Sequence, residues 1–133
     1  MIKMVKFVYQ KIVRDKTVER HNAAGIKTQY KMLGGKELCQ ALLLKLLEES
    51  NEVCVANNRE ELVSELADVL EVIDGLCKAN SINLEEVMQR KQQKHNERGG
   101  FETGLYVERI ETDEDSPTAK HLRASPDKYP EIK

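Results

Sequence analysis

The chain has 133 residues, a formal net charge of −2 and 33% charged residues. This length fits one domain with a real core, and the nearly balanced charge argues against a general nucleic-acid-binding protein. No stretch approaches the roughly 18 apolar residues of a membrane span, and the start lacks a signal-peptide core, so we expect no membrane partner. The three cysteines are widely spaced, which predicts reduced thiols in a cytoplasmic protein: Cys39, Cys54 and Cys77.

The first third of the chain predicts an arm, a short helix and the start of a long helix. Residues 1–13 mix β-branched and aromatic residues with lysine, which is typical of a short strand or an extended arm. A short helix is expected over 17–24, ended by Gly25. Residues 26–34 lead to a first long helix over 36–57. Its ALLLKLLE core is apolar on more than one face, which indicates the centre of a bundle or an oligomer interface.

Two more helices follow. Asn58 and Glu61 form a capping-box-like start for a second long helix that runs to about residue 79. The connection is short, so the two long helices should pack antiparallel. A third helix is expected over 83–97, with an inward side made of three apolar residues: Leu84, Val87 and Met88. The fold class is therefore all-α, an antiparallel helical bundle with short extended segments at both ends.

The last part of the chain is predicted to be less regular. Residues 101–110 have strand character and could pair with the N-terminal arm. Residues 112–133 hold all three prolines and little apolar content, so we expect a tail that is mobile or wrapped on a partner subunit. We therefore divide the chain into a helical domain over 1–111 and a tail over 112–133.

Acidic residues occupy unusual positions on the two long helices. At about 100° per residue, Glu49 falls inside the apolar stripe of the first helix and Glu52 lies on its flank. Glu65 and Asp68 follow one edge of the second helix, and both pairs lie about two turns from the connection. The two pairs of acids should therefore lie at a similar position along the antiparallel helix pair. Four facing carboxylates are costly unless they share a hard cation such as Mg²⁺, or Mn²⁺ as a substitute. The alternative is a solvated acidic face, which is common on helices.

These acids also carry a family resemblance. EESNE at 48–52 and ELAD at 65–68 have the form E-E-x-x-E…E-x-x-D, which resembles the metal-binding signature of the all-α, MazG-like nucleoside triphosphate pyrophosphohydrolases. YQKIVRDK at 9–16 is similar to the "K-L-V-R-D-K" opening of one branch of that superfamily. RGGF at 98–101 is similar to its "R-G-G-F" close. The resemblance spans about residues 8 to 105.

The resemblance implies a hydrolase that acts on phosphorus-containing anhydrides. It implies attack on the α–β linkage of a nucleoside triphosphate, which gives a monophosphate and pyrophosphate in nucleotide-pool clearing or regulation. The metal ligands would be four carboxylates: Glu49, Glu52, Glu65 and Asp68. A carboxylate near the attacking water must act as base, and Glu48 and Glu49 are both candidates. A homodimer or homotetramer is expected from the two-faced first helix and from the resemblance.

Basic residues could neutralise the remaining charge of a triphosphate. Lys91, Lys94 and Arg98 are spaced i, i+3, i+7 and so share a face of the third helix. They form either a solvated stripe or a phosphate-binding face, and the resemblance supports the second interpretation. Arg14 either only packs the arm or reaches a substrate phosphate, as the resemblance suggests.

Three other interpretations of the acidic helices compete with this one. A ferritin-like di-iron protein would need Glu-x-x-His pairs, but Val55 and Asp68 stand three residues after Glu52 and Glu65. A non-catalytic binding or assembly module would keep the apolar helix without acids in register. A phosphoribosyl-ATP pyrophosphohydrolase of histidine biosynthesis lies within the same superfamily, although the K-I-V-R-D-K opening looks more like the nucleotide-clearing branch.

Overall fold

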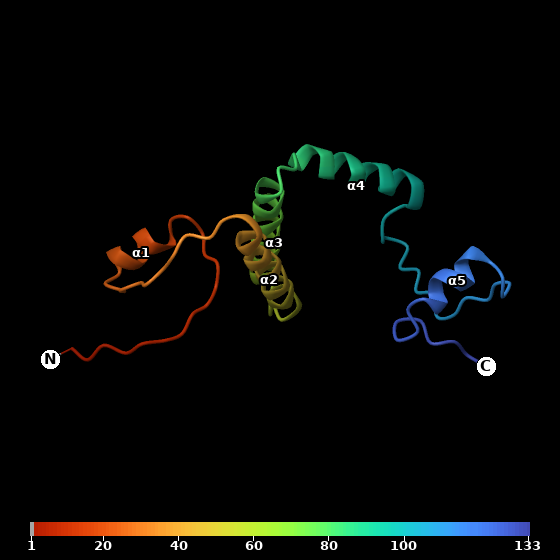
Figure 1. Cartoon of the computed structure of the whole chain (residues 1–133), viewed down its shortest axis with the longest axis horizontal. Helices are drawn as coiled ribbons and strands as arrows, with labels where there is room; N and C mark the ends of the chain where they lie inside the picture. Colours follow the sequence, from red (N-terminus) through yellow and green to blue (C-terminus); the bar gives the residue numbers. More distant parts are fainter. Residues whose placement is uncertain (1) are drawn as a thin grey trace. The chain divides into compact units, whose positions relative to one another are not determined.

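The structure is a computed structural model that describes residues 2–133 (Figure 1). Within these residues it contains five helices and no strand. The helices are α1 (Thr17–Ala23), α2 (Gly35–Cys54), α3 (Arg59–Ala79), α4 (Leu84–Arg98) and α5 (Pro117–Arg123). The chain divides into two compact units, one ending at Lys94 and one starting at His95.

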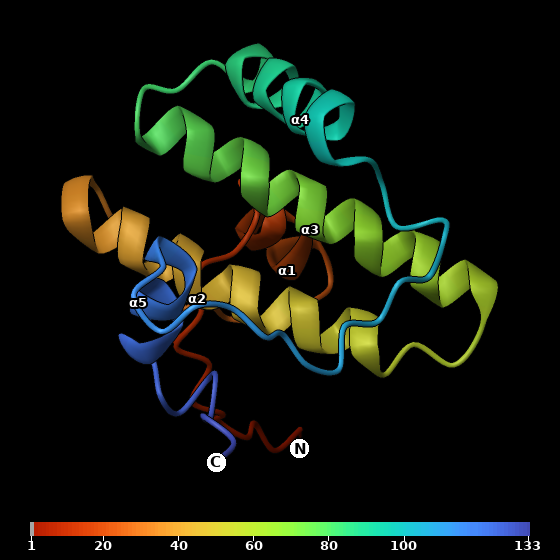
Figure 2. The same cartoon turned by 90° about the vertical axis from the view of Figure 1, so that its right-hand side faces the viewer.

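The first unit is built on an antiparallel hairpin of α2 and α3, which lie side by side over their length (Figure 2). The connection over 55–58 is short, as predicted. The Asn58 side chain begins α3 by accepting a hydrogen bond from the Glu61 backbone N–H at 2.9 Å. The Glu61 carboxylate in turn accepts from the Asn57 N–H at 2.8 Å, so the predicted capping box is present with its return bond shifted by one residue.

The packed side of α2 is the predicted apolar stripe. Leu38, Leu42 and Leu46 are partly buried, and Glu49 on the same face is buried. On α3, Val72 and Cys77 are buried. The two helices approach closely at Gly75, where an added Cβ would lie 3.4 Å from a Leu42 methyl group. Gly75 therefore faces the Leu42 side chain across the hairpin.

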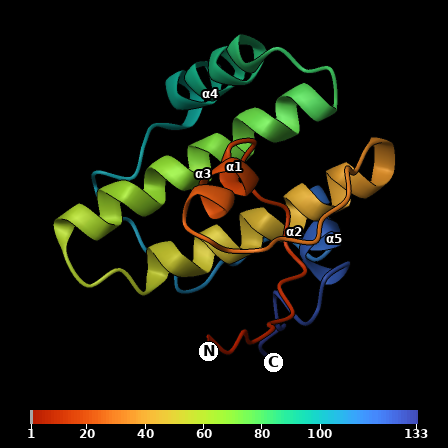
Figure 3. The same ribbon diagram turned by 90° about the vertical axis from the view of Figure 1, so that its left-hand side faces the viewer.

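The other elements of the first unit are less enclosed. α1 and the segment before it lie to one side of the hairpin (Figure 3). Gly25, at φ +75°, ends this helix as predicted, because a left-handed conformation there costs glycine little. Every residue of α4 is exposed, so the predicted inward side of that helix is wrong for the single chain. Its few apolar residues are left at least 38% exposed in the single chain: Leu84, Val87 and Met88.

The strand predicted over 101–110 is wrong, because this segment pairs with no other segment within residues 2–133 and makes only a local turn, from the Gly104 N–H to the Phe101 carbonyl. For the N-terminal segment we expected a short strand or an extended arm, and residues 2–13 form an arm without a strand. The predicted tail contains a short helix, α5. Its start has a plain signal, because Ser116 accepts from the Ala119 N–H at 3.0 Å and Pro117 occupies the first turn. Arg123 then binds Glu131 at 2.6 Å and ties the end of the chain to α5.

Two further expectations concern the whole chain. All three cysteines are unpaired, but only Cys77 is buried; Cys39 is partly buried and Cys54 is exposed. Among residues 2–133, none of the helices combines the length and the apolar content that crossing a bilayer demands.

Candidate functional site

Three carboxylates from the two long helices converge in the hairpin. Glu49 comes from α2, and Glu65 and Asp68 come from α3 one turn apart. One oxygen of each lies within 4.8 Å of an oxygen of the other two. The antiparallel geometry explains the meeting, because Glu49 precedes the connection by about as many turns as the other two acids follow it. The register predicted from spacing therefore brings these three acids together.

Glu52, the fourth predicted ligand, lies at the margin of this group. Its side chain is exposed, and it lies outside the set of mutually close oxygens. It is still near enough for its charge to act on Glu65. The pKa of Glu65 is raised, first by partial loss of hydration and then by the negative charges of Asp68, Glu49 and Glu52. The site is thus a concentrated negative region with one carboxyl that resists ionisation.

Cations already offset part of this charge. Lys45, one turn before Glu49 on α2, lies 3.4 Å from Glu49 and 3.6 Å from Glu48. Arg14, from the segment before α1, contacts Asp68 at 2.6 Å and Glu71 at 4.0 Å. Arg14 directly follows the N-terminal arm, so its ion pairs join the end of the arm to α3 at the acid cluster.

Glu48 is held by a second residue of the arm. The Lys11 ammonium donates to the Glu48 carboxylate at 3.0 Å. This hydrogen bond, more than any other contact, lowers the pKa of Glu48, and the same contact raises the pKa of Lys11. Glu48 therefore stays ionised and holds a proton weakly.

The three converging carboxylates fit a small hard cation. An octahedral ion with oxygens at about 2.1 Å places neighbouring ligands about 3 Å apart and opposite ones about 4.2 Å apart. The oxygens of Glu49, Glu65 and Asp68 lie within 4.8 Å of one another, so reaching that geometry shortens these separations by at most about 1.8 Å. All three donors are carboxylate oxygens, the kind that Mg²⁺ and Mn²⁺ prefer. Imidazole or thiolate donors, which would favour zinc, are missing from this group.

The predicted phosphate-binding residues fall into two groups. Arg14 lies at the acid cluster, as its two ion pairs show. Lys91, Lys94 and Arg98 are exposed on α4, and no ion pair within residues 2–133 involves them. The structure therefore brings the arm cation, but not the α4 stripe, into contact with the carboxylates.

Sequence reasoning missed two residues of this cluster, Lys11 and Lys45. Lys45 had a usable signal, because its i, i+3 and i, i+4 spacing to Glu48 and Glu49 places the three on one helix face. Lys11 lies inside the KIVRDK stretch that carries the resemblance, but its partner is on a distant helix, and no local spacing could identify it.

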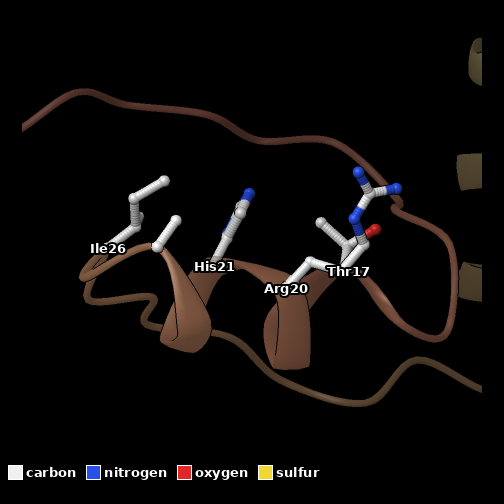
Figure 4. A pocket seen from close by; sticks show the side chains of 5 residues that line it. Thr17, Arg20, His21 and Ile26 are labelled. Carbon is white, nitrogen blue, oxygen red and sulfur yellow. The ribbon is translucent and has the colours of Figure 1, made fainter.

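A separate hollow lies on α1. It has a volume of about 310 Å³ and is lined by five residues: Thr17, Arg20, His21, Ala24 and Ile26. Arg20 and His21 extend to the same side of the helix (Figure 4), and His21 Nδ1 lies 2.9 Å from the Thr28 hydroxyl. The lining contains no carboxylate, so this hollow is not a candidate cation site.

The protein is all-α, and its two long helices bring carboxylates together in a hairpin. These features place it in the class of MazG-like proteins. The match to known families is more specific. Residues 26–95 match the model for phosphoribosyl-ATP pyrophosphohydrolase, which is more than half of the chain. The chain therefore belongs to the phosphoribosyl-ATP pyrophosphohydrolase family. No curated protein matches the sequence, and no solved structure matches it.

The family match bears out the predicted resemblance and the all-α fold class. It covers both acidic segments, 48–52 and 65–68, and most of α4. It leaves out the KIVRDK segment and the RGGF segment at 98–101. At the level of the family, the chain is a pyrophosphohydrolase.

Proposed function

We propose that the chain is a Mg²⁺-dependent nucleoside triphosphate pyrophosphohydrolase, which cleaves the α–β linkage and releases a nucleoside monophosphate and pyrophosphate. One observation carries the proposal: Glu49, Glu65 and Asp68 present oxygens within 4.8 Å of one another in a chain of a pyrophosphohydrolase family. Hydrolysis of a phosphoanhydride depends mainly on positioning and charge neutralisation, with little covalent work for side chains. A site of this kind needs few groups beyond those described.

Glu49, Glu65 and Asp68 would hold the cation, with Glu52 available as a fourth ligand at the exposed edge. When bound, Mg²⁺ would neutralise phosphate charge and make an attacking water more acidic. Mn²⁺ would substitute, because it prefers the same oxygen donors. The ionised carboxylates also fix where the phosphates lie, since a triphosphate can approach them only through a shared cation.

Glu49 is the better of the two candidate bases. Glu48 is ion-paired with Lys11 and Lys45, which keeps it ionised but makes it a poor acceptor for a proton. Glu49 is buried beside the other carboxylates, and within residues 2–133 its ion pair is with Lys45 at 3.4 Å. We therefore assign Glu49 to the proton transfer and Glu48 to positioning through Lys45, which both acids contact.

Arg14, Lys91, Lys94 and Arg98 would supply positive charge to the triphosphate. The position of Arg14 at Asp68 supports its role directly. The α4 residues are supported by their shared face and by their exposure, which leaves them available to a ligand.

Phosphoribosyl-ATP is the second candidate substrate, because the matching family is described by its hydrolysis. The same reaction would apply, because this substrate also carries a triphosphate. The KIVRDK segment lies outside the family match and contributes Lys11 and Arg14 to the acid cluster, which favours a substrate set different from that of the described family. We therefore rank ordinary nucleoside triphosphates first.

The test is a panel of ribo- and deoxyribonucleoside triphosphates and phosphoribosyl-ATP, with Mg²⁺ or Mn²⁺ and with a chelator. We expect metal-dependent release of pyrophosphate and a monophosphate from at least one nucleoside triphosphate. Release of orthophosphate would mean that another bond is cleaved. Activity on phosphoribosyl-ATP alone would establish the second candidate, and no activity on the whole panel would favour a binding module.

We also propose that the chain works as a homodimer or homotetramer. Among residues 2–133, only Val72, Cys77 and Ala119 are buried apolar residues, whereas a lone domain of this length buries roughly two-thirds of its surface. Leu43, Leu44 and Leu47 of α2 are 52%, 68% and 63% exposed. A second copy would offer the same apolar face and so cover this one.

Sedimentation of the purified chain tests the proposed assembly. We expect a dimer or tetramer, shifted toward smaller species by Leu47→Lys and unchanged by Gln40→Lys on an already polar position of α2. Sedimentation of the unmodified chain as a single copy would exclude the assembly.

A further inference from the structure

Lys11 and Arg14 reach the acid cluster from a segment without regular secondary structure. Lys11 binds Glu48 at 3.0 Å, and Arg14 binds Asp68 at 2.6 Å. These contacts join positions 37 and 54 residues apart in the sequence. Within residues 2–133, these two contacts and the longer Arg14–Glu71 contact of 4.0 Å are the ion pairs that connect the N-terminal segment to the hairpin.

The two arm cations differ from the third cation of the cluster. Lys45 belongs to the same helix as its partners, and its side chain is only 21% exposed, so it cannot move far. Lys11 and Arg14 are 44% and 59% exposed and stand on irregular backbone. Because these side chains are partly hydrated, their ion pairs are weak and can be exchanged for others.

The charge balance shows why such an exchange would occur. The connected cluster contains six carboxylates and three cations. The carboxylates are Glu48, Glu49, Glu52, Glu65, Asp68 and Glu71, and the cations are Lys11, Arg14 and Lys45. A divalent ion bound among Glu49, Glu65 and Asp68 would supply part of the missing positive charge. Asp68 would then no longer need Arg14.

We propose that Lys11 and Arg14 form an exchangeable clamp, which holds Glu48 and Asp68 in the metal-free chain and is displaced from Asp68 when a divalent cation binds. The proposal rests on the cation site of the proposed function. Arg14 competes with the cation, because its guanidinium occupies a carboxylate that the cation needs. Once displaced, Arg14 and its neighbour Lys11 face a site that receives a triphosphate. The arm thus couples cation binding to the arrival of positive charge for the phosphates.

A purely structural ion pair would behave differently. If Arg14 only anchored the arm, its removal would loosen the site and leave cation affinity unchanged or lower. If Arg14 competes with the cation, its removal must raise cation affinity. The direction of the change therefore separates the two roles without any measurement of turnover.

The experiment is a calorimetric titration of the full chain with Mn²⁺ in the absence of nucleotide. We expect Arg14→Gln to bind Mn²⁺ several-fold more tightly than the unmodified chain, and Arg14→Lys to lie between them. Arg20→Gln is the matched control, since it removes the same charge from α1 at a residue that lines the separate hollow. We expect it to leave the affinity unchanged.

Unchanged or weaker Mn²⁺ binding by Arg14→Gln would overturn the clamp while leaving the cation site intact. Failure of the unmodified chain to bind Mn²⁺ at all would overturn the proposed cation site, and the clamp with it. The failure of the inference and the failure of the proposed function therefore give different results.

A second titration tests the other half of the exchange. With saturating Mn²⁺, the probe is α,β-methylene-ATP, which resists cleavage at the α–β bond. We expect Arg14→Gln and Lys11→Gln each to bind it about tenfold more weakly, as the loss of one charge-assisted hydrogen bond predicts, while Arg20→Gln binds it normally. Equal affinity in all four chains would show that the arm does not transfer its charge to the phosphates.

Discussion

The α2–α3 hairpin and α4 both carry charged residues at helical spacing, but the two sets differ in their ion-pair partners. In the hairpin, acids from both helices converge and cations from two elements offset them. On α4, Lys91, Lys94 and Arg98 are exposed and have no ion-pair partner within residues 2–133. Under the proposed function, a ligand of the hairpin would have to exchange partners with ion-paired residues, whereas a ligand could contact the α4 cations without breaking an ion pair.

The largest effect is expected from the acid cluster of the hairpin. Asp68→Asn should lower kcat/KM for the best triphosphate at least about 100-fold, because a neutral amide is a poor ligand for the cation that neutralises the phosphates. The melting temperature should change by only a few degrees, since the Arg14–Asp68 pair is partly exposed and worth at most about 1 kcal/mol. Steady-state kinetics and circular dichroism measure the two quantities.

Glu60→Gln is the matched control for this substitution. Glu60 lies in the first turn of α3, and it is exposed and outside the carboxylate group. We expect normal activity. Full activity of Asp68→Asn would contradict the proposal that Asp68 binds a cation needed for the reaction, and the hairpin would then resemble any other acidic helix.

A smaller effect is expected from α4. Lys94→Ala should raise KM for the triphosphate about tenfold, which is the usual contribution of one charge-assisted hydrogen bond. Since Lys94 makes no ion pair within residues 2–133, the folded chain should keep its stability. Lys120→Ala, an exposed lysine of α5, removes the same charge elsewhere. If Lys94→Ala has unchanged kcat and KM, the stripe is a solvated face.

The sequence predicts the hairpin well because its geometry is local. Helical spacing sets the face of Glu49, and the short connection sets its height relative to Glu65 and Asp68. Asn58 also signals where α3 begins, and its side chain makes the expected cap. Each of these features depends on residues close together in the chain, so pattern alone carries the information.

The remaining features depend on distant or external partners. The Lys11–Glu48 contact spans 37 residues, and no periodic pattern records it. Residues 101–110 have strand-forming side chains but no strand, because β-propensity reflects the neighbours that a segment finds. α4 has apolar residues that the single chain does not bury. In each case the missing information is what the segment packs against.

The raised pKa of Glu65 makes the stability of the chain depend on pH. A raised pKa means that the folded chain keeps this proton at pH values where the unfolded chain has lost it. Stability linked to Glu65 is therefore present below its ordinary pKa and lost as pH rises through the raised value. Glu65→Gln removes this loss. We expect the melting-temperature gain of the variant over the unmodified chain to grow from about pH 4 to about pH 7.

Glu48 should show the opposite trend. Its pKa is lowered by the Lys11 hydrogen bond, so its stabilisation is present above the ordinary value and lost as pH falls through the lowered one. Glu48→Gln should therefore be most destabilising at neutral pH. Exposed Glu108, which lies outside the acid cluster, is the control, and we expect Glu108→Gln to leave the melting temperature unchanged. Parallel curves for all three variants would contradict the described charge arrangement.

The smallest effect tests how closely the hairpin helices pack. Gly75 lies within α3, and a Cβ there would meet Leu42 at 3.4 and 3.8 Å, which is ordinary van der Waals contact. Alanine therefore fits, and its better helix propensity should raise the free energy of unfolding by roughly 0.5–1 kcal/mol. Denaturant unfolding measures this change.

A bulkier Gly75→Leu should instead push α2 away from α3 and lower both stability and Mn²⁺ affinity, because the acids that meet across the hairpin depend on the same register. If Gly75→Leu stabilises the chain, α2 and α3 do not pack closely at Gly75. The separation of the carboxylates across the hairpin would then also differ from the one described.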